Sequence, residues 1–222
     1  MGVKSVENTD RLYWLGRYSE RVYTTLKLFG KSYDAMIESI EGGYQGFCQS
    51  LDIPNIYKTG EDFLKRYPFD ETDSNSIMSN LIRAYDNAIE LREEIGSESL
   101  SYIQLAVYDM QKARESCAPM LEFQKVADYI LAFWGITDDL IPDENTRNII
   151  KVGKRVERID LYGRLKAGKP EMIREIHRLT GRIDRCNIRY RKESIENLSK
   201  LIREENLDYR KIVEEIDRIL EV

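Results

Sequence analysis

GRYSER at residues 16–21 and GKRVER at residues 153–158 are two copies of one pattern, a glycine and a basic residue followed, after two intervening residues, by Glu-Arg. The match continues at the same offset, because Lys27-Leu28 aligns with Arg164-Leu165. A solvent-exposed helix surface has no physical reason to repeat residue types in register. We therefore predict two helices that play equivalent parts in one fold.

The glycine that opens each copy, Gly16 or Gly153, falls within a segment of helical period. A glycine inside a helix costs about 1 kcal/mol relative to alanine. Close approach of another helix or of a ligand is the best explanation for it. We predict that the two motif helices pack near each other and are related by an approximate two-fold axis.

The charged residues of each copy share one face of their helix. At about 100° per residue, the basic and acidic positions of the repeat lie together, and Leu12, Leu15 and Val22 lie on the opposite side. The candidate residues of an anion-binding or polar network are Arg17, Glu20, Arg21, Lys27, Lys154, Glu157, Arg158, Asp160 and Arg164. We expect a shared, partly buried network centred on the two Glu-Arg pairs. The alternative is two solvated faces whose ion pairs contribute about 0.2–0.5 kcal/mol each.

The remaining sequence is also dominated by helical spacing of apolar residues. Expected helices span about residues 9–40, 73–95, 97–116, 119–140, 143–168, a long charged segment after Pro170, and 207–220. We expect residues 46–67 to be irregular. No segment alternates convincingly as a strand would, and short turns favour an antiparallel bundle. The prediction is an all-α bundle of about six to eight helices with two pseudo-symmetric motif helices, in one domain over residues 1–222, with charged helices at 169–222 packing on it.

The composition is that of a folded globular protein. Of the 222 residues, 42% are hydrophobic and 33% are charged, and the net charge of −5 argues against general binding of polyanions such as nucleic acid. The longest apolar run, residues 129–136, is too short to cross a bilayer. The first residues have no apolar segment typical of a signal peptide. We expect a cytoplasmic protein with no membrane association and with free, mostly buried cysteines.

A basic stripe distinguishes the late charged segment. Helical spacing predicts that one face carries Arg174, Arg178, Arg182, Arg185 and Arg189. One interpretation is a solvated face that balances the carboxylates of an acidic protein. The other is docking to an acidic partner or to a phosphorylated ligand. Nucleic acid is disfavoured here too, because no aromatic residues are interleaved with the basic ones.

Residues for catalysis or metal binding are few. His177 is the single histidine, and we interpret it as a surface residue. One histidine is too few for a di-iron carboxylate bundle. Asp138-Asp139 with Asp143 could imitate an acidic Mg²⁺ motif, but Pro142 separates them, and capping of helix ends explains them better. We predict no metal and no cofactor.

The repeat also carries a resemblance to a known family. Residues 12–21, LYWLGRYSER, resemble the opening signature of the alpha-E domain family, and residues 153–164, including Asp160, resemble its second Glu-Arg helix. Residues 69–77 are similar to the acidic, serine-rich helix entry of that family. Tyr85 and Ile89 stand where the family pattern has arginines.

The resemblance implies a helical fold and an accessory role. Alpha-E proteins are linked with ATP-grasp ligases and transglutaminase-like peptidases, so the resemblance implies work with such a partner in peptide or amide-bond metabolism. One alternative is an enzyme or binding protein in which Arg17, Arg21, Arg158 and Arg164 hold an anionic small molecule, with Glu20 or Glu157 as the base. Another is a structural bundle that forms a homodimer. The scarcity of catalytic groups favours a protein that is not itself an enzyme.

Overall fold

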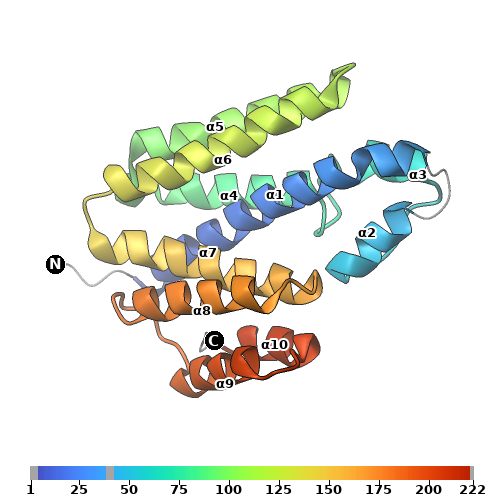
Figure 1. Ribbon diagram of the computed structural model, residues 1–222. Coiled ribbons are helices and arrows are strands. Elements are labelled where there is room, and N and C mark those ends of the chain that lie inside the picture. Colours follow the sequence, from blue (N-terminus) through green and yellow to red (C-terminus); the bar gives the residue numbers. More distant parts are fainter. Residues whose placement is uncertain (1–4, 39–42, 221–222) are drawn as a thin grey trace. The chain divides into compact units, whose positions relative to one another are not determined.

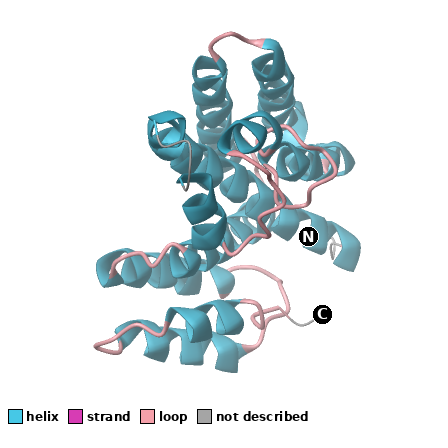
Figure 2. Cartoon of the chain, turned by 90° about the vertical axis from the view of Figure 1, so that its right-hand side faces the viewer, coloured by secondary structure: helices cyan, strands magenta, loops and turns pink. Residues whose placement is uncertain are grey.

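The computed structural model describes residues 5–38 and 43–220, and ten helices lie within these ranges (Figure 1). No strand occurs in the described part of the chain, where extended pairing is confined to one antiparallel bridge between Tyr190 and Leu220 (Figure 2). The predicted all-α class is therefore confirmed. None of the described helices combines the length and the apolar character that crossing a membrane requires.

The chain divides into two compact units, one formed by residues 1–17 and 143–222 and the other by residues 18–142. The first helix, α1 (Val6–Glu38), belongs to the first unit as far as Arg17 and to the second unit from Tyr18 onward. The expectation of one domain over residues 1–222, with helices of 169–222 packing on it, stays a prediction.

The first unit contains the start of α1 and four further helices, α7 (Glu144–Arg164), α8 (Lys169–Ile183), α9 (Lys192–Arg203) and α10 (Tyr209–Ile216). α7 and α8 run side by side (Figure 1). α7 packs on α8 and α10, and α9 packs on α8 and α10. Asp143 caps α7, because its carboxylate accepts a hydrogen bond from the backbone N–H of Thr146 at 3.0 Å. This confirms the interpretation of Asp143 as a helix cap.

The second unit combines a helical hairpin with an aromatic core. Its helices, besides the rest of α1, are α2 (Gly43–Leu51), α3 (Gly60–Arg66), α4 (Ile77–Glu90), α5 (Arg92–Glu115) and α6 (Pro119–Asp139). α5 packs on α4 and on α6, and Figure 1 shows α5 and α6 side by side. Pro119 occupies the first turn of α6, as predicted. Gly96, at φ 80°, interrupts the start of α5, where the sequence indicated a helix end.

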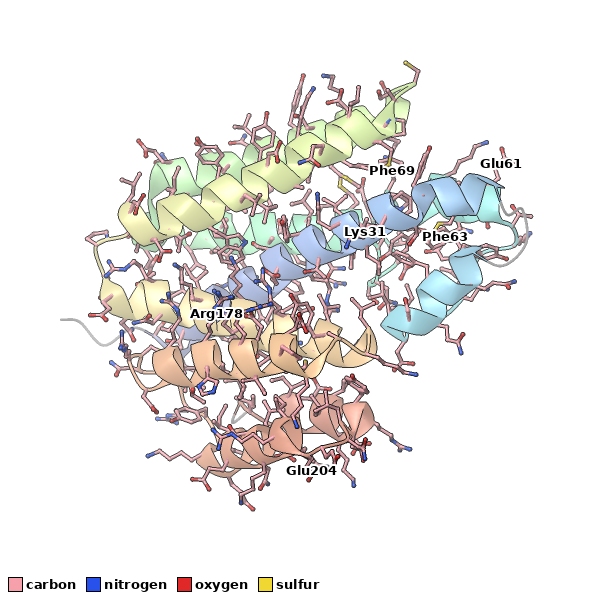
Figure 3. All side chains as sticks on the ribbon, viewed as in Figure 1. Lys31, Glu61, Phe63, Phe69, Arg178 and Glu204 are labelled. Carbon is pink, nitrogen blue, oxygen red and sulfur yellow. The ribbon has the colours of Figure 1, made fainter. Side chains whose placement is uncertain are left out.

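The prediction of an irregular segment at residues 46–67 is wrong for residues 46–51 and 60–66, where α2 and α3 lie, and holds for residues 52–59 between them. Both helices are too short to display a clear apolar period. Thr59 caps α3, and the rings of Phe63 and Tyr67 stack at 4.9 Å. Figure 3 labels Phe63 in this aromatic core, which also contains Phe29 and Phe47. Tertiary packing of aromatic rings, rather than local periodicity, stabilises these two helices.

The late charged segment is not one long helix. α8 ends at Ile183 and α9 begins at Lys192. Between them the backbone turns to meet the end of the chain, where the Arg191 N–H donates to the Ile219 carbonyl at 2.8 Å. The helix expected over residues 73–95 starts later, because α4 begins at Ile77 and Ser76 is its cap. The predicted end of the first helix near Ile40 lies outside the described residues.

Candidate functional site

The two motif helices cross at their glycines. A Cβ atom added to Gly16 of α1 would lie 2.0 Å from the carbonyl oxygen of Ile150 in α7. A Cβ atom added to Gly153 of α7 would lie 2.1 Å from the carbonyl oxygen of Tyr13 in α1. Real Cβ atoms do not approach backbone this closely, so glycine is required at both positions. The predicted close approach of the two helices is confirmed.

The crossing is symmetric in register. Ile150 stands three residues before Gly153, and Tyr13 stands three residues before Gly16. The residues after the glycines correspond as well. A Cβ atom added to Gly16 would lie 3.0 Å from the backbone nitrogen of Lys154, and one added to Gly153 would lie 3.2 Å from the backbone nitrogen of Arg17. Each glycine therefore packs on the equivalent backbone of the other copy, as a local two-fold relation demands.

An ion-pair network accompanies this crossing. The Nε of Arg17 donates to the Oε2 of Glu157 at 2.7 Å, and its Nη2 lies 3.7 Å from the Oδ2 of Asp160. Arg164 donates to the other oxygen of Asp160 at 2.9 Å. The side chains of Glu157 and Asp160 are each 1% exposed, and that of Arg17 is 10% exposed. The network thus links charged groups of the two copies inside the first unit.

The electrostatics keep Arg17 permanently charged. Burial lowers the pKa of Arg17, but Glu157, Tyr13 and Asp160 together more than offset this, so the pKa is raised above its ordinary value. The guanidinium also lies 5.1 Å from the ring centre of Trp14 and 5.9 Å from that of Tyr13. Burial raises the pKa of Tyr13 to about 12. Arg17 can therefore hold an anion in place but cannot transfer a proton.

The Glu-Arg pair of the first copy falls in the second unit. Glu20 is fully buried and accepts a hydrogen bond from the hydroxyl of Thr24 at 3.1 Å. Arg21 is half-buried and Lys27 is exposed. Because the other copy belongs to the first unit, the predicted union of Glu20-Arg21 with Glu157-Arg158 stays a prediction.

The second copy directs its basic residues toward α8. The buried carboxylate of Glu175 accepts hydrogen bonds from Arg155 at 2.7 Å and from Arg178 at 2.8 Å. Arg158 and Arg174 approach the same carboxylate at 3.9 and 3.7 Å. The sequence pattern alone did not predict this role for Glu175. Its position three residues after the buried Met172 was the signal that could have revealed it.

Further cations extend this arrangement along both helices. We define the basic seam as Arg147, Lys151, Arg155 and Arg158 of α7, Arg174, Arg178 and Arg182 of α8, and Arg185 just after it. Figure 3 shows Arg178 where α8 runs beside α7. Arg182 of α8 donates to the side-chain oxygen of Asn148 of α7 at 3.0 Å, so a hydrogen bond connects the two helices within the seam.

The cations of the basic seam repel one another. Burial, then Arg182 and Arg155, lower the pKa of Lys151 to about 8. Burial also lowers the pKa of Arg182, with further contributions from Arg185 and Arg147. The pKa of Arg155 is lowered by burial in spite of Glu175. Positive charge is therefore concentrated here in a protein whose net charge is −5.

The predicted docking residues separate into two groups. Arg174, Arg178 and Arg182 lie on α8, and the first two are exposed. Arg185 and Arg189 are exposed but follow the end of the helix, so the predicted continuous stripe is wrong beyond Ile183. Lys154 is half-buried.

The other candidate groups are scattered. His177 is exposed, as predicted. Within residues 5–38 and 43–220, no three His, Cys, Asp or Glu side chains are grouped so as to hold a metal ion. The cysteines are free, but only Cys48 is buried, whereas Cys117 is exposed and Cys186 is partly exposed.

These features define a class of all-helical protein in which two Glu-Arg helices cross at paired glycines. The chain belongs to the Alpha-E family, whose model is described as a predicted alpha-helical domain with a conserved ER motif and matches residues 8–190. Both Glu-Arg pairs of this chain lie within the matched range. No curated protein and no solved structure gave a match.

Proposed function

We propose that this chain is a non-catalytic accessory protein that works with an ATP-grasp ligase or a transglutaminase-like peptidase in peptide or amide-bond metabolism. Membership of the Alpha-E family supports this assignment, since the resemblance of its motifs to that family implies such partners. The observation that carries the non-catalytic part is the ion pair between Arg17 and Glu157, which is buried at a helix crossing.

The burial of the Arg17–Glu157 pair favours a structural role for the motif over a catalytic one. A general base must be able to reach a proton on the substrate. Glu157 is 1% exposed and its Oε2 is hydrogen-bonded to a permanently charged arginine. An acid-base role would require that pair to break. A structural role, in which the ion pair holds α1 and α7 in register, needs no such break.

The basic side chains left at the surface suit the docking of an acidic partner. Arg174, Arg178, Arg185 and Arg189 are exposed in an otherwise acidic protein. Complementary charge raises association rates and selects the orientation of a partner. We therefore assign the partner-facing surface to α8 and the segment that follows it.

Co-purification with a tagged ATP-grasp ligase or transglutaminase-like peptidase from the same genome tests this proposal. We expect a complex at micromolar concentration that is weakened by the double change Arg185→Glu and Arg189→Glu, since neither residue supports the Glu175 cluster. The double change Arg210→Glu and Lys211→Glu on α10 alters the net charge equally at exposed positions and serves as the control. A complex that both variants form as well as the wild type would contradict the docking surface, and absence of any complex would contradict the accessory role.

A binding protein for an anionic small molecule is the second candidate. The concentration of positive charge in the basic seam favours it. In that case Glu157 would act in the scaffold, and the basic side chains of α7 and α8 would hold the ligand.

A further inference from the structure

Three buried or half-buried cations of the basic seam, which we call the seam floor, act on one another: Lys151, Arg155 and Arg182. Lys151 is 4% exposed, and the side chain of Arg155 is 13% exposed. Lys151 and Arg155 stand one turn apart on α7, and Arg182 stands one turn after Arg178 on α8. The two helices therefore present three cationic groups to one small region.

Glu175 carries one negative charge among several arginines of the seam. Its two oxygens are already occupied, one by Arg155 and the other by Arg178. Four arginines in total lie within 4 Å of this one carboxylate. Concentrating like charges in a partly buried site costs free energy unless an anion compensates them. The carboxylate instead holds the guanidinium groups in fixed directions, as a supporting residue does in an anion site.

Two hydrogen-bonding features leave capacity for a ligand. The Nε–H of Arg155 is buried and has no acceptor among the described residues. Arg182 donates to the amide oxygen of Asn148, which is neutral and supplies no negative charge to the guanidinium. A buried donor without an acceptor is uncommon in folded proteins and calls for an explanation such as a missing ligand.

We propose that the seam floor binds the phosphate groups of a small phosphorylated ligand. A guanidinium fork matches two phosphate oxygens, and a lysine ammonium adds a compact charge, so this residue set suits a multiply charged oxyanion. A protein surface would engage the exposed rim, at Arg174 and Arg178, before it reached Lys151. A diphosphate has the charge and the number of oxygens to contact all three floor residues together.

Calorimetric titration with pyrophosphate, at constant ionic strength set with chloride, tests the proposal. We expect saturable binding by the wild-type chain, and a loss of about tenfold or more in affinity for Arg182→Gln, since that variant lacks a charge-assisted hydrogen bond to the phosphate. Arg210→Gln on α10 removes an exposed arginine that is not part of the basic seam and should bind as the wild type does. Equal weakening in both variants, or binding that chloride reproduces, would overturn the site.

A second measurement needs no substitution and so does not depend on the folding of a variant. The pKa of Lys151, followed by NMR of its side chain, should rise from about 8 when pyrophosphate is added, because a bound anion favours the charged amine. An unchanged pKa at saturating pyrophosphate would contradict the proposal. So would binding of an acidic peptide to the seam by a chain that does not bind pyrophosphate, which would instead identify a protein-docking surface. The partner test above is independent of either result.

Discussion

Arg17 of α1 and Glu157 of α7, 140 residues apart in sequence, meet in a buried ion pair of 2.7 Å beside the crossing of Gly16 and Gly153. The pair joins the basic residue of one copy of the motif to the glutamate of the other. The glycines allow the helices to approach, and the charged groups that are buried as a result must then satisfy one another. The repeated motif is thus a device for joining two helices.

Substitution of the crossing glycine should be strongly destabilising. Gly16→Ala places a methyl group against the Ile150 carbonyl, so we expect the free energy of unfolding to fall by about 3 kcal/mol or more. Gly181→Ala in α8 is the matched control, because nothing lies within 4 Å of its Cβ position. That variant should be stabilised by up to about 1 kcal/mol. Urea unfolding measures both changes, and equal effects would argue against a tight crossing.

The buried lysine predicts a dependence of stability on pH. Burial, Arg182 and Arg155 lower the pKa of Lys151 to about 8 in the folded chain, against 10.5 as the ordinary value. Between these values the unfolded chain binds the proton more tightly, so the free energy of unfolding should rise as pH increases from about 8 to 10.5. Lys151→Met should lack that contribution and give a flatter profile. Parallel profiles for the two proteins, from denaturant unfolding at each pH, would show that Lys151 is not responsible.

Removal of the carboxylate at the centre of the arginines should destabilise the first unit. Glu175→Gln leaves Arg155 and Arg178 without their charged acceptor, and we expect a loss of about 3 kcal/mol at low salt. Pyrophosphate or sulfate should recover part of that loss by supplying negative charge, whereas chloride at equal ionic strength should recover less. Thermal unfolding in each salt measures the recovery. A variant as stable as the wild type would contradict the role assigned to Glu175.

How far the sequence predicts this structure depends on whether a feature is periodic. The repeat around Gly16 and Gly153 fixes residue types at a constant offset, so it predicted both the close approach and the two-fold relation. α2 and α3 escaped prediction because short helices held by the stacking of Phe63 and Tyr67 depend on contacts that local spacing does not contain.

The sequence predicted which charged residues belong to the candidate site, but it did not predict which of them pair with one another. The charged residues of the motif are visible in sequence, but the choice of Glu157 as the partner of Arg17 follows from the helix crossing. The grouping of Arg155 and Arg158 around Glu175 follows from the side-by-side packing of α7 and α8. The spacing of the arginines predicted that Arg185 and Arg189 continue a helix. The chain instead turns after Ile183, where Arg191 makes a backbone hydrogen bond with Ile219, and local spacing does not contain this distant contact.

A double-mutant cycle on Arg17→Met and Glu157→Gln, followed by urea unfolding, tests most directly the claim that the Glu-Arg motif joins two helices. Each single change deprives a buried charge of its hydrogen-bonded partner and should cost about 3–5 kcal/mol. The double variant should lose less than the sum, with a coupling energy of about 1.5–3 kcal/mol. Additive losses within about 0.5 kcal/mol, or single variants as stable as the wild type, would contradict the claim.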